Sequence, residues 1–194
     1  MVAAFGTCDG AEVDVVVTSD GVPVLRHDDR LADGTAVRSL TVSELRRATG
    51  ASDDDLPTFA DVLDALGDRL ARGVWNVELK APGAARALRT FAGRLSGVIF
   101  TSFFVTEVMD AGRWFEGVPA GLLTAHAPIP YVPPGVQWLS VRHPALAEVR
   151  AAHPTCALLA WTINDGAAAA RARAAGCLGW IGDDVAVLSR LRDG

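Results

Sequence analysis

Short apolar runs and segments of helical periodicity alternate along most of this chain. Runs rich in β-branched and aliphatic residues predict eight strands. In chain order these runs are EVDVVV, VPVL, VWNVELK, VIFTSF, PAGLL, VQWLSV, ALLAWTI and CLGWIG. Helices are predicted from Thr41, from Phe59 to Gly73, over Ala84–Leu95, Thr106–Phe115, Pro144–Ala152 and Gly166–Gly176, and through Leu191. Such alternation indicates a parallel sheet with helical crossovers, either doubly wound or a (β/α)8 barrel.

The first two apolar runs differ from the others in how they are joined. Only four residues, Thr18 to Gly21, separate them, which is too short for a parallel crossover, so we expect an antiparallel hairpin. Seven crossover strands then remain where a TIM barrel needs eight, and 194 residues is short of the ~250 usual for that fold. We predict an α/β fold, an irregular TIM (β/α)8 barrel that lacks its first strand, as one domain over residues 1–194.

Composition narrows the class of protein. The chain is 50% hydrophobic, enough for a sizeable core, and its net charge of −5 without a Lys/Arg cluster argues against nucleic-acid binding. The cysteines, Cys8, Cys156 and Cys177, are widely spaced and indicate free thiols in a reducing compartment. The start, MVAAFGTCDG, lacks the features of a signal peptide, and the apolar runs are shorter than the ~18–20 residues of a membrane span. We therefore expect a soluble cytoplasmic protein of undetermined oligomeric state.

Two acidic residues alternate along the first strand. Glu12 and Asp14 share one face of that strand, roughly 6.5–7 Å apart along the backbone. Two carboxylates at this spacing can bind one hard cation. On these residues alone, a solvated acidic face is the commoner meaning of the pattern.

A second polar pair stands in the run VWNVELK. Period two places Trp75, Val77 and Leu79 on one face, and Glu78 and Lys80 on the other. In a barrel the apolar set packs under helices, so Glu78 and Lys80 would lie at the carboxyl mouth, where barrel enzymes carry their chemistry. The alternative is a buried Glu–Lys pair that ties two strands together.

Several of these pieces together resemble one enzyme family. The run EVDVVVTSDGVPVLRHD, followed by LTVSELR, LPTFADVL and NVELK, is similar in order and spacing to the glycerophosphodiester phosphodiesterase family, whose fold is an irregular TIM barrel. Thr101–Phe103, Trp161–Asn164 and Gly179–Asp184 also match that family. The resemblance covers nearly the whole chain.

The resemblance implies a set of site residues. Glu12, Asp14 and Glu78 match the family's ligands for a divalent cation, Mg²⁺ or Ca²⁺, and oxygen-only ligands suit such a hard ion. His27 matches one of two histidines that act as general acid and base. Lys80 matches a basic residue that faces the phosphate.

The resemblance also implies a substrate. Trp161 resembles an aromatic wall beside the glycerol or the headgroup, with a core tryptophan whose indole N–H is satisfied as the alternative. The implied activity is a hydrolase of lipid metabolism that cleaves glycerophosphodiesters to glycerol 3-phosphate and an alcohol. Its partner would be this small-molecule substrate.

The sequence also departs from the family's pattern. The family begins with a His-Arg-Gly strand end and Pro-Glu-Asn-Thr, whereas Met1–Phe5 here resembles the interior of the next helix. The resemblance is thus to an N-terminally truncated member, without the first histidine and its arginine. The alternative function is a degenerate, non-catalytic member that keeps a cation or phosphate-ester pocket. His126, which follows PAGLL, is a hypothetical substitute for the lost histidine.

Overall fold

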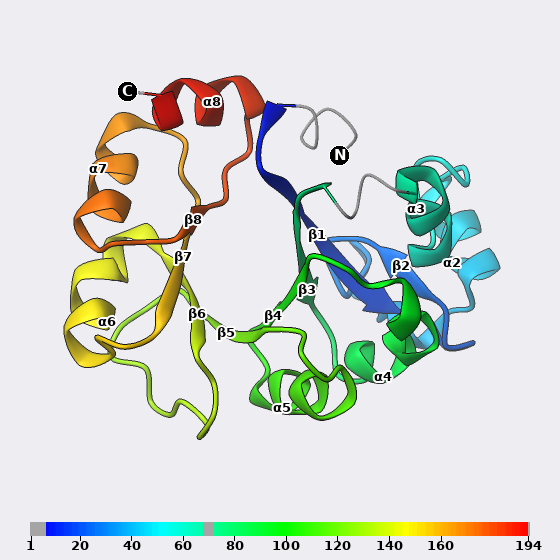
Figure 1. Ribbon diagram of the computed structural model, residues 1–194. Coiled ribbons are helices and arrows are strands. Elements are labelled where there is room, and N and C mark those ends of the chain that lie inside the picture. The colour runs from blue at the N-terminus through cyan, green and yellow to red at the C-terminus, as the bar shows by residue number, and fades with distance from the viewer. Residues whose placement is uncertain (1–6, 68–71, 194) are drawn as a thin grey trace.

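A curled eight-stranded sheet forms the centre of the computed structural model, with helices on its outer face (Figure 1). The structure describes residues 7–67 and 72–193. The strands are β1 (Gly10–Val17), β2 (Pro23–Leu25), β3 (Val74–Leu79), β4 (Val98–Ser102), β5 (Ala120–Thr124), β6 (Trp138–Arg142), β7 (Ala157–Trp161) and β8 (Gly179–Trp180). The α-helices are α2 (Val42–Thr49), α3 (Phe59–Leu66), α4 (Ala84–Leu88), α5 (Val105–Trp114), α6 (Leu146–Ala152), α7 (Gly166–Ala174) and α8 (Val185–Asp193). The 3-10 helices are η1 (Val37–Ser39), η3 (Arg89–Arg94) and η4 (His143–Ala145).

The strand order is β2-β1-β3-β4-β5-β6-β7-β8. β1 and β2 pair antiparallel, with Val15 opposite Leu25 and Val17 opposite Pro23. The remaining pairs are parallel. The predicted hairpin and the predicted parallel α/β sheet are therefore confirmed.

The sheet is a curled half-barrel. Among the described residues, β8 pairs with β7 and with no strand at the other end of the sheet. Helix α8 lies beside the start of β1, where the Arg192 guanidinium is 3.8 Å from the Asp9 carboxylate. That the barrel lacks a first strand stays a prediction.

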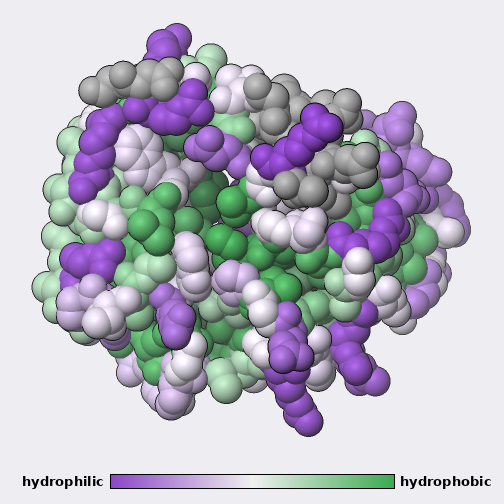
Figure 2. Space-filling view, viewed as in Figure 1, coloured by the Kyte–Doolittle hydropathy of each residue, from purple (hydrophilic) through white to green (hydrophobic). Residues whose placement is uncertain are grey.

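Apolar side chains on the outer face of the sheet pack under the helices. Val13, Val15, Trp75 and Val77 belong to a buried cluster with residues of α3, α4 and α5. Phe59 of α3 stacks on Trp75, with the ring centroids 5.1 Å apart. Because successive strand residues alternate between faces, burial of these side chains directs their polar neighbours to the inner face. Figure 2 shows apolar residues gathered toward the middle of the molecule and hydrophilic ones toward its periphery.

Side-chain caps fix where two helices begin. The predicted capping box at Thr41 and Glu44 is confirmed, and Thr58 and Asp61 form a second one. The helix predicted from Phe59 to Gly73 is shorter than expected. It ends at Leu66, because Gly67 takes a positive φ of 48° that helical residues do not adopt. Residues 68–71 of that prediction lie outside the described residues.

The connection from β5 to β6 carries no helix between residues 125 and 137, all of which are described. Its prolines, among them Pro128 and Pro134, lack the backbone N–H that a helix interior needs. In the described ranges, no helix is long and apolar enough to cross a membrane.

Close approach of β1 to β3 requires glycine at position 10. A Cβ there would lie 1.8 Å from the Val74 carbonyl oxygen, whereas a Cβ at Gly112 in α5 would meet nothing within 4 Å. We expect Gly10→Ala to destabilise the fold by about 3 kcal/mol, which lowers Tm by roughly 5–10 °C. Gly112→Ala is the matched control and should be neutral or stabilising by about 0.5–1 kcal/mol. Thermal unfolding measures both, and equal Tm values for the two variants would contradict the predicted clash.

Candidate functional site

Three carboxylates meet on the inner face of β1 and β3. Glu12 and Asp14 come from β1 and Glu78 comes from β3, and the parallel register places Asp14 directly opposite Glu78. One carboxylate oxygen from each residue lies within 4.8 Å of the other two. The sheet therefore brings together the three residues that the family resemblance implied as ligands.

Lys80 connects the two strands at this point. Its Nζ lies 3.0 Å from Glu78 Oε1 and 3.5 Å from Asp14 Oδ1, and the three side chains are only 12–19% exposed. The Glu–Lys pair considered as a purely structural alternative is thus present. It compensates one of the three negative charges, so the cluster keeps an excess of acid.

Burial and mutual repulsion shape the charge state of this cluster. The pKa of Glu12 is raised to about 8, mainly by burial and also by the charges of Asp14 and Glu78, while the charge of Lys80 opposes the shift. Burial also raises the pKa of Glu78 against the opposing hydrogen bond from Lys80. The pKa of Lys80 is raised because Glu78 and Asp14 outweigh its own burial. With all three carboxylates ionised, two further positive charges are needed to neutralise them: a proton supplies one of these charges and a divalent cation supplies both.

The residues present fit a divalent cation. Oε1 of Glu12 is buried and has no hydrogen-bond partner among the described residues, and an orphaned acceptor of this kind is costly unless a cation or donor meets it. The donor set consists of carboxylate oxygens alone, which suits a hard ion such as Mg²⁺ or Ca²⁺. The geometry does not distinguish these two ions.

His27 lies just beyond the end of β2, beside β1. The Arg26 backbone N–H donates to the Asp14 carbonyl over 3.0 Å, which ties the hairpin end to the carboxylate-bearing strand. His27 is 72% exposed, and its Nδ1 lies 2.7 Å from Asp28 Oδ1. With Nδ1 engaged by Asp28, Nε2 is the nitrogen that can meet a substrate.

Trp161 ends β7 on the inner face and meets Phe103, a residue for which the sequence predicted no role although it lies in a segment that resembles the family. Phe103, which follows β4, contacts Trp161 edge to face, with ring centroids 5.9 Å apart, and is 46% exposed. The Trp161 indole N–H is buried without a partner in the part of the chain that the structure describes. This differs from the alternative of a core tryptophan with a satisfied N–H. The signal for Phe103 was its position directly after a strand end.

His126 lies on the β5–β6 connection. Its side chain is exposed, and its backbone N–H donates to the Thr124 hydroxyl over 3.3 Å. Nothing in its described contacts links it to the carboxylates, so its role stays a hypothesis.

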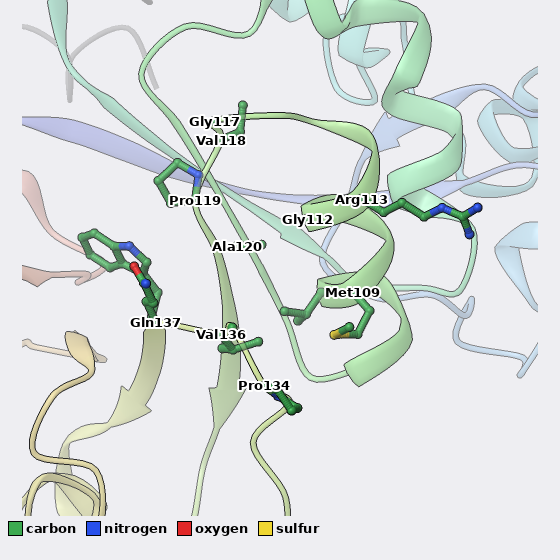
Figure 3. A pocket seen from close by; sticks show the side chains of 13 residues that line it. Met109, Gly112, Arg113, Gly117, Val118, Pro119, Ala120, Pro134, Val136 and Gln137 are labelled. Carbon is green, nitrogen blue, oxygen red and sulfur yellow. The ribbon is translucent and has the colours of Figure 1, made fainter.

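A cavity of about 550 Å³ lies elsewhere, between α5 and the residues that begin β5 and β6 (Figure 3). It is therefore at the amino ends of the strands, opposite the end that carries Glu78 and Lys80. Arg113 is its one charged lining residue, and Figure 3 shows that side chain pointing away from Gln137. Without converging acid–base or ligand groups, this cavity is not the candidate site.

The segment that carries most of the candidate site residues matches a known protein family. Residues 2–85 match the model of the glycerophosphoryl diester phosphodiesterase family. The matched segment holds Glu12, Asp14, His27, Glu78 and Lys80. The part of the chain over residues 2–85 is thus similar to the glycerophosphodiester phosphodiesterase family. The resemblance that the sequence motifs indicated is thereby confirmed.

Relatives extend the likeness along the chain. "Probable glycerophosphodiester phosphodiesterase 2" of Mycobacterium tuberculosis is 39% identical over 77 residues, which are 38% of this chain and 28% of the relative. A crystal structure of a glycerophosphodiester phosphodiesterase from Thermotoga maritima is 24% identical, covers 93% of this chain and 84% of its own, and has a TM-score of 0.73. The structure of an Oleispira antarctica phosphodiesterase in complex with the product sn-glycerol-3-phosphate is 19% identical and has a TM-score of 0.76. The match covers 99% of this chain and 88% of the Oleispira antarctica chain. The two structures show that the fold is shared.

The raised pKa of Glu12 predicts how stability depends on pH without metal. Between its ordinary pKa of 4.5 and the folded value of about 8, the folded state holds a proton that the unfolded chain has released. The free energy of unfolding should therefore fall as pH rises through this window, by on the order of a few kcal/mol.

Denaturant titrations at pH 5 to 9 in a chelator measure this slope. Glu12→Gln should flatten it, because the amide cannot titrate. A slope that is unchanged in Glu12→Gln would contradict the assignment to this residue.

Proposed function

We propose that this chain is a metal-dependent phosphodiesterase that hydrolyses glycerophosphodiesters to glycerol 3-phosphate and an alcohol. The observation that carries the proposal is the convergence of Glu12, Asp14, Glu78 and Lys80 within the segment that matches the family. The proposed unit is one domain over residues 1–194. We also propose that the protein acts in lipid metabolism and that it is located in the cytoplasm.

The carboxylates and the lysine would bind different parts of the complex, the carboxylates the cation and the lysine the phosphate. Glu12, Asp14 and Glu78 would hold the divalent cation. When bound, that ion neutralises and orients the phosphodiester. The Lys80 ammonium, already held over Asp14 and Glu78, offsets negative charge on the non-bridging phosphate oxygens.

His27 and the aromatic residues would complete the site. Asp28 engages Nδ1 of His27, so the ring is oriented to exchange a proton at Nε2 with the attacking water or the leaving oxygen. Trp161, in contact with Phe103, offers an apolar surface for the carbon skeleton of the glycerol or the alcohol.

In the family, a second histidine acts with the one that His27 matches. No His-Arg-Gly motif occurs in the 194 residues, so these residues do not supply that histidine. Within these 194 residues, water or His126 is the proposed candidate for the role of that histidine. The glycerol 3-phosphate bound by the Oleispira antarctica protein supports the proposed product.

Turnover by the 194-residue chain tests the activity. Release of glycerol 3-phosphate is measured from glycerophosphocholine and glycerophosphoglycerol with Mg²⁺ or Ca²⁺, and again with a chelator. We expect metal-dependent release, and a loss of about a hundredfold or more in kcat in His27→Gln because a general acid–base group is removed.

Glu78→Gln should abolish the metal-dependent turnover. The matched control is Glu116→Gln, because Glu116 is an exposed residue beyond α5 and its variant should keep that turnover. Metal-dependent turnover that survives in Glu78→Gln would contradict the proposed ligand set. No turnover from folded wild-type chain would overturn the enzymatic proposal and leave a non-catalytic family member.

Cation binding has a second readout that does not need activity. Mg²⁺ or Ca²⁺ at about 100 times its Kd should stabilise the fold by about 2.7 kcal/mol, which raises Tm by roughly 5–10 °C. At one fixed ion concentration the rise should be larger at pH 8 than at pH 6, because the ion must displace the proton that Glu12 holds at the lower pH. Glu78→Gln should remove most of the rise and Glu116→Gln none of it. An equal rise in both variants would show that the ion binds elsewhere.

A further inference from the structure

The strands opposite the carboxylates carry a single charge on their inner face. Leu139 and Val141 of β6, and Leu158 and Ala160 of β7, pack in the helix-facing core. Strand alternation therefore turns Arg142 to the inner face. By the same alternation, the other inner-face positions of β4 to β7 carry uncharged side chains.

Arg142 lies at the mouth and next to the aromatic pair. It is the last residue of β6, and its Cα pairs with that of Trp161 at the end of β7, so their side chains stand on one face about 5 Å apart. Trp161 in turn contacts Phe103 from beyond β4. Arg142, Trp161 and Phe103 thus form one wall at the same strand ends that carry Glu78 and Lys80 on the other wall.

The charge of Arg142 is free to meet a ligand. Its side chain is exposed, and no described residue forms a hydrogen bond or ion pair with it. The acidic residues on the loops that follow β7 and β8 have other partners. Asp165 accepts from the Ala168 N–H at the start of α7, Asp183 accepts from the Asn164 amide, and Asp184 accepts from the Ala186 N–H. A guanidinium next to an aromatic ring is well suited to bind a carboxylate with two parallel hydrogen bonds.

We propose that Arg142 determines specificity by binding a carboxylate on the alcohol part of the substrate. This inference rests on the proposed function. With the phosphodiester at the carboxylate–lysine wall, the alcohol extends toward the wall of Arg142. An alcohol that carries a carboxylate pairs with the guanidinium, whereas an alcohol that carries only an ammonium group meets a like charge there.

Two substrates that differ by one carboxylate test the idea. Glycerophosphoserine is glycerophosphoethanolamine with a carboxylate added to the alcohol. We expect the chain to bind glycerophosphoserine about tenfold more tightly, as measured by calorimetry with Mg²⁺ on the His27→Gln chain, in which turnover is slowed. If the wild-type chain shows no turnover, the same titrations are made on it directly.

Arg142→Gln should remove the preference by weakening binding of the serine diester alone, and Arg142→Lys should keep part of it. Arg113→Gln, an exposed arginine at the opposite strand ends, should leave it intact. An unchanged preference in Arg142→Gln, or no preference in the parent chain, would overturn the inference. Turnover without a preference for glycerophosphoserine would refute only the role of Arg142 and leave the phosphodiesterase proposal standing. A preference for glycerophosphoserine without turnover would refute only the phosphodiesterase proposal and leave the role of Arg142 in binding standing.

Discussion

Three carboxylates within 4.8 Å of one another on the inner face of two neighbouring strands are the constraint on which this structure depends. Burial and mutual repulsion both oppose such a cluster, and Lys80 relieves only part of the cost. The arrangement persists because the packed outer face of β1 and β3 holds the strands in one register. A site that is electrostatically unfavourable when empty is well prepared to bind a cation, since the ion removes the repulsion that the fold maintains.

The curl of the sheet gives this cluster an opposite wall. β4 and β7 are separated by two strands in the sheet order, yet Phe103 and Trp161 touch across the inner face. The mouth therefore has a carboxylate–lysine side and an aromatic side that ends in Arg142. The proposed ionic centre for a phosphate and the proposed surface for the attached alcohol both depend on this single bend of the sheet.

The clustering of charged side chains, rather than the volume of a cavity, marks the candidate functional end of the molecule. The 550 Å³ cavity at the amino ends of the strands results from a β5–β6 connection without a helix, and it gathers no reactive groups. Glu78 and Lys80 lie toward the carboxyl end of their strand, which is the end where barrel enzymes carry their catalytic groups. The family match over residues 2–85 contains the carboxylates, the lysine and His27, and the opposite wall lies beyond it.

Local patterns in the sequence determined much of the fold. Period two placed Glu12 with Asp14, and Glu78 with Lys80, on polar faces. A four-residue link required the hairpin, and Thr41 with Glu44 marked a helix start. The family motifs predicted the three ligands, but neighbours along the chain could not show that Asp14 would stand opposite Glu78, that Lys80 would reach across to β1, or that Phe103 would meet Trp161. These contacts depend on strand register and sheet curvature, which long-range packing of the helices sets, and only the tertiary structure decided them.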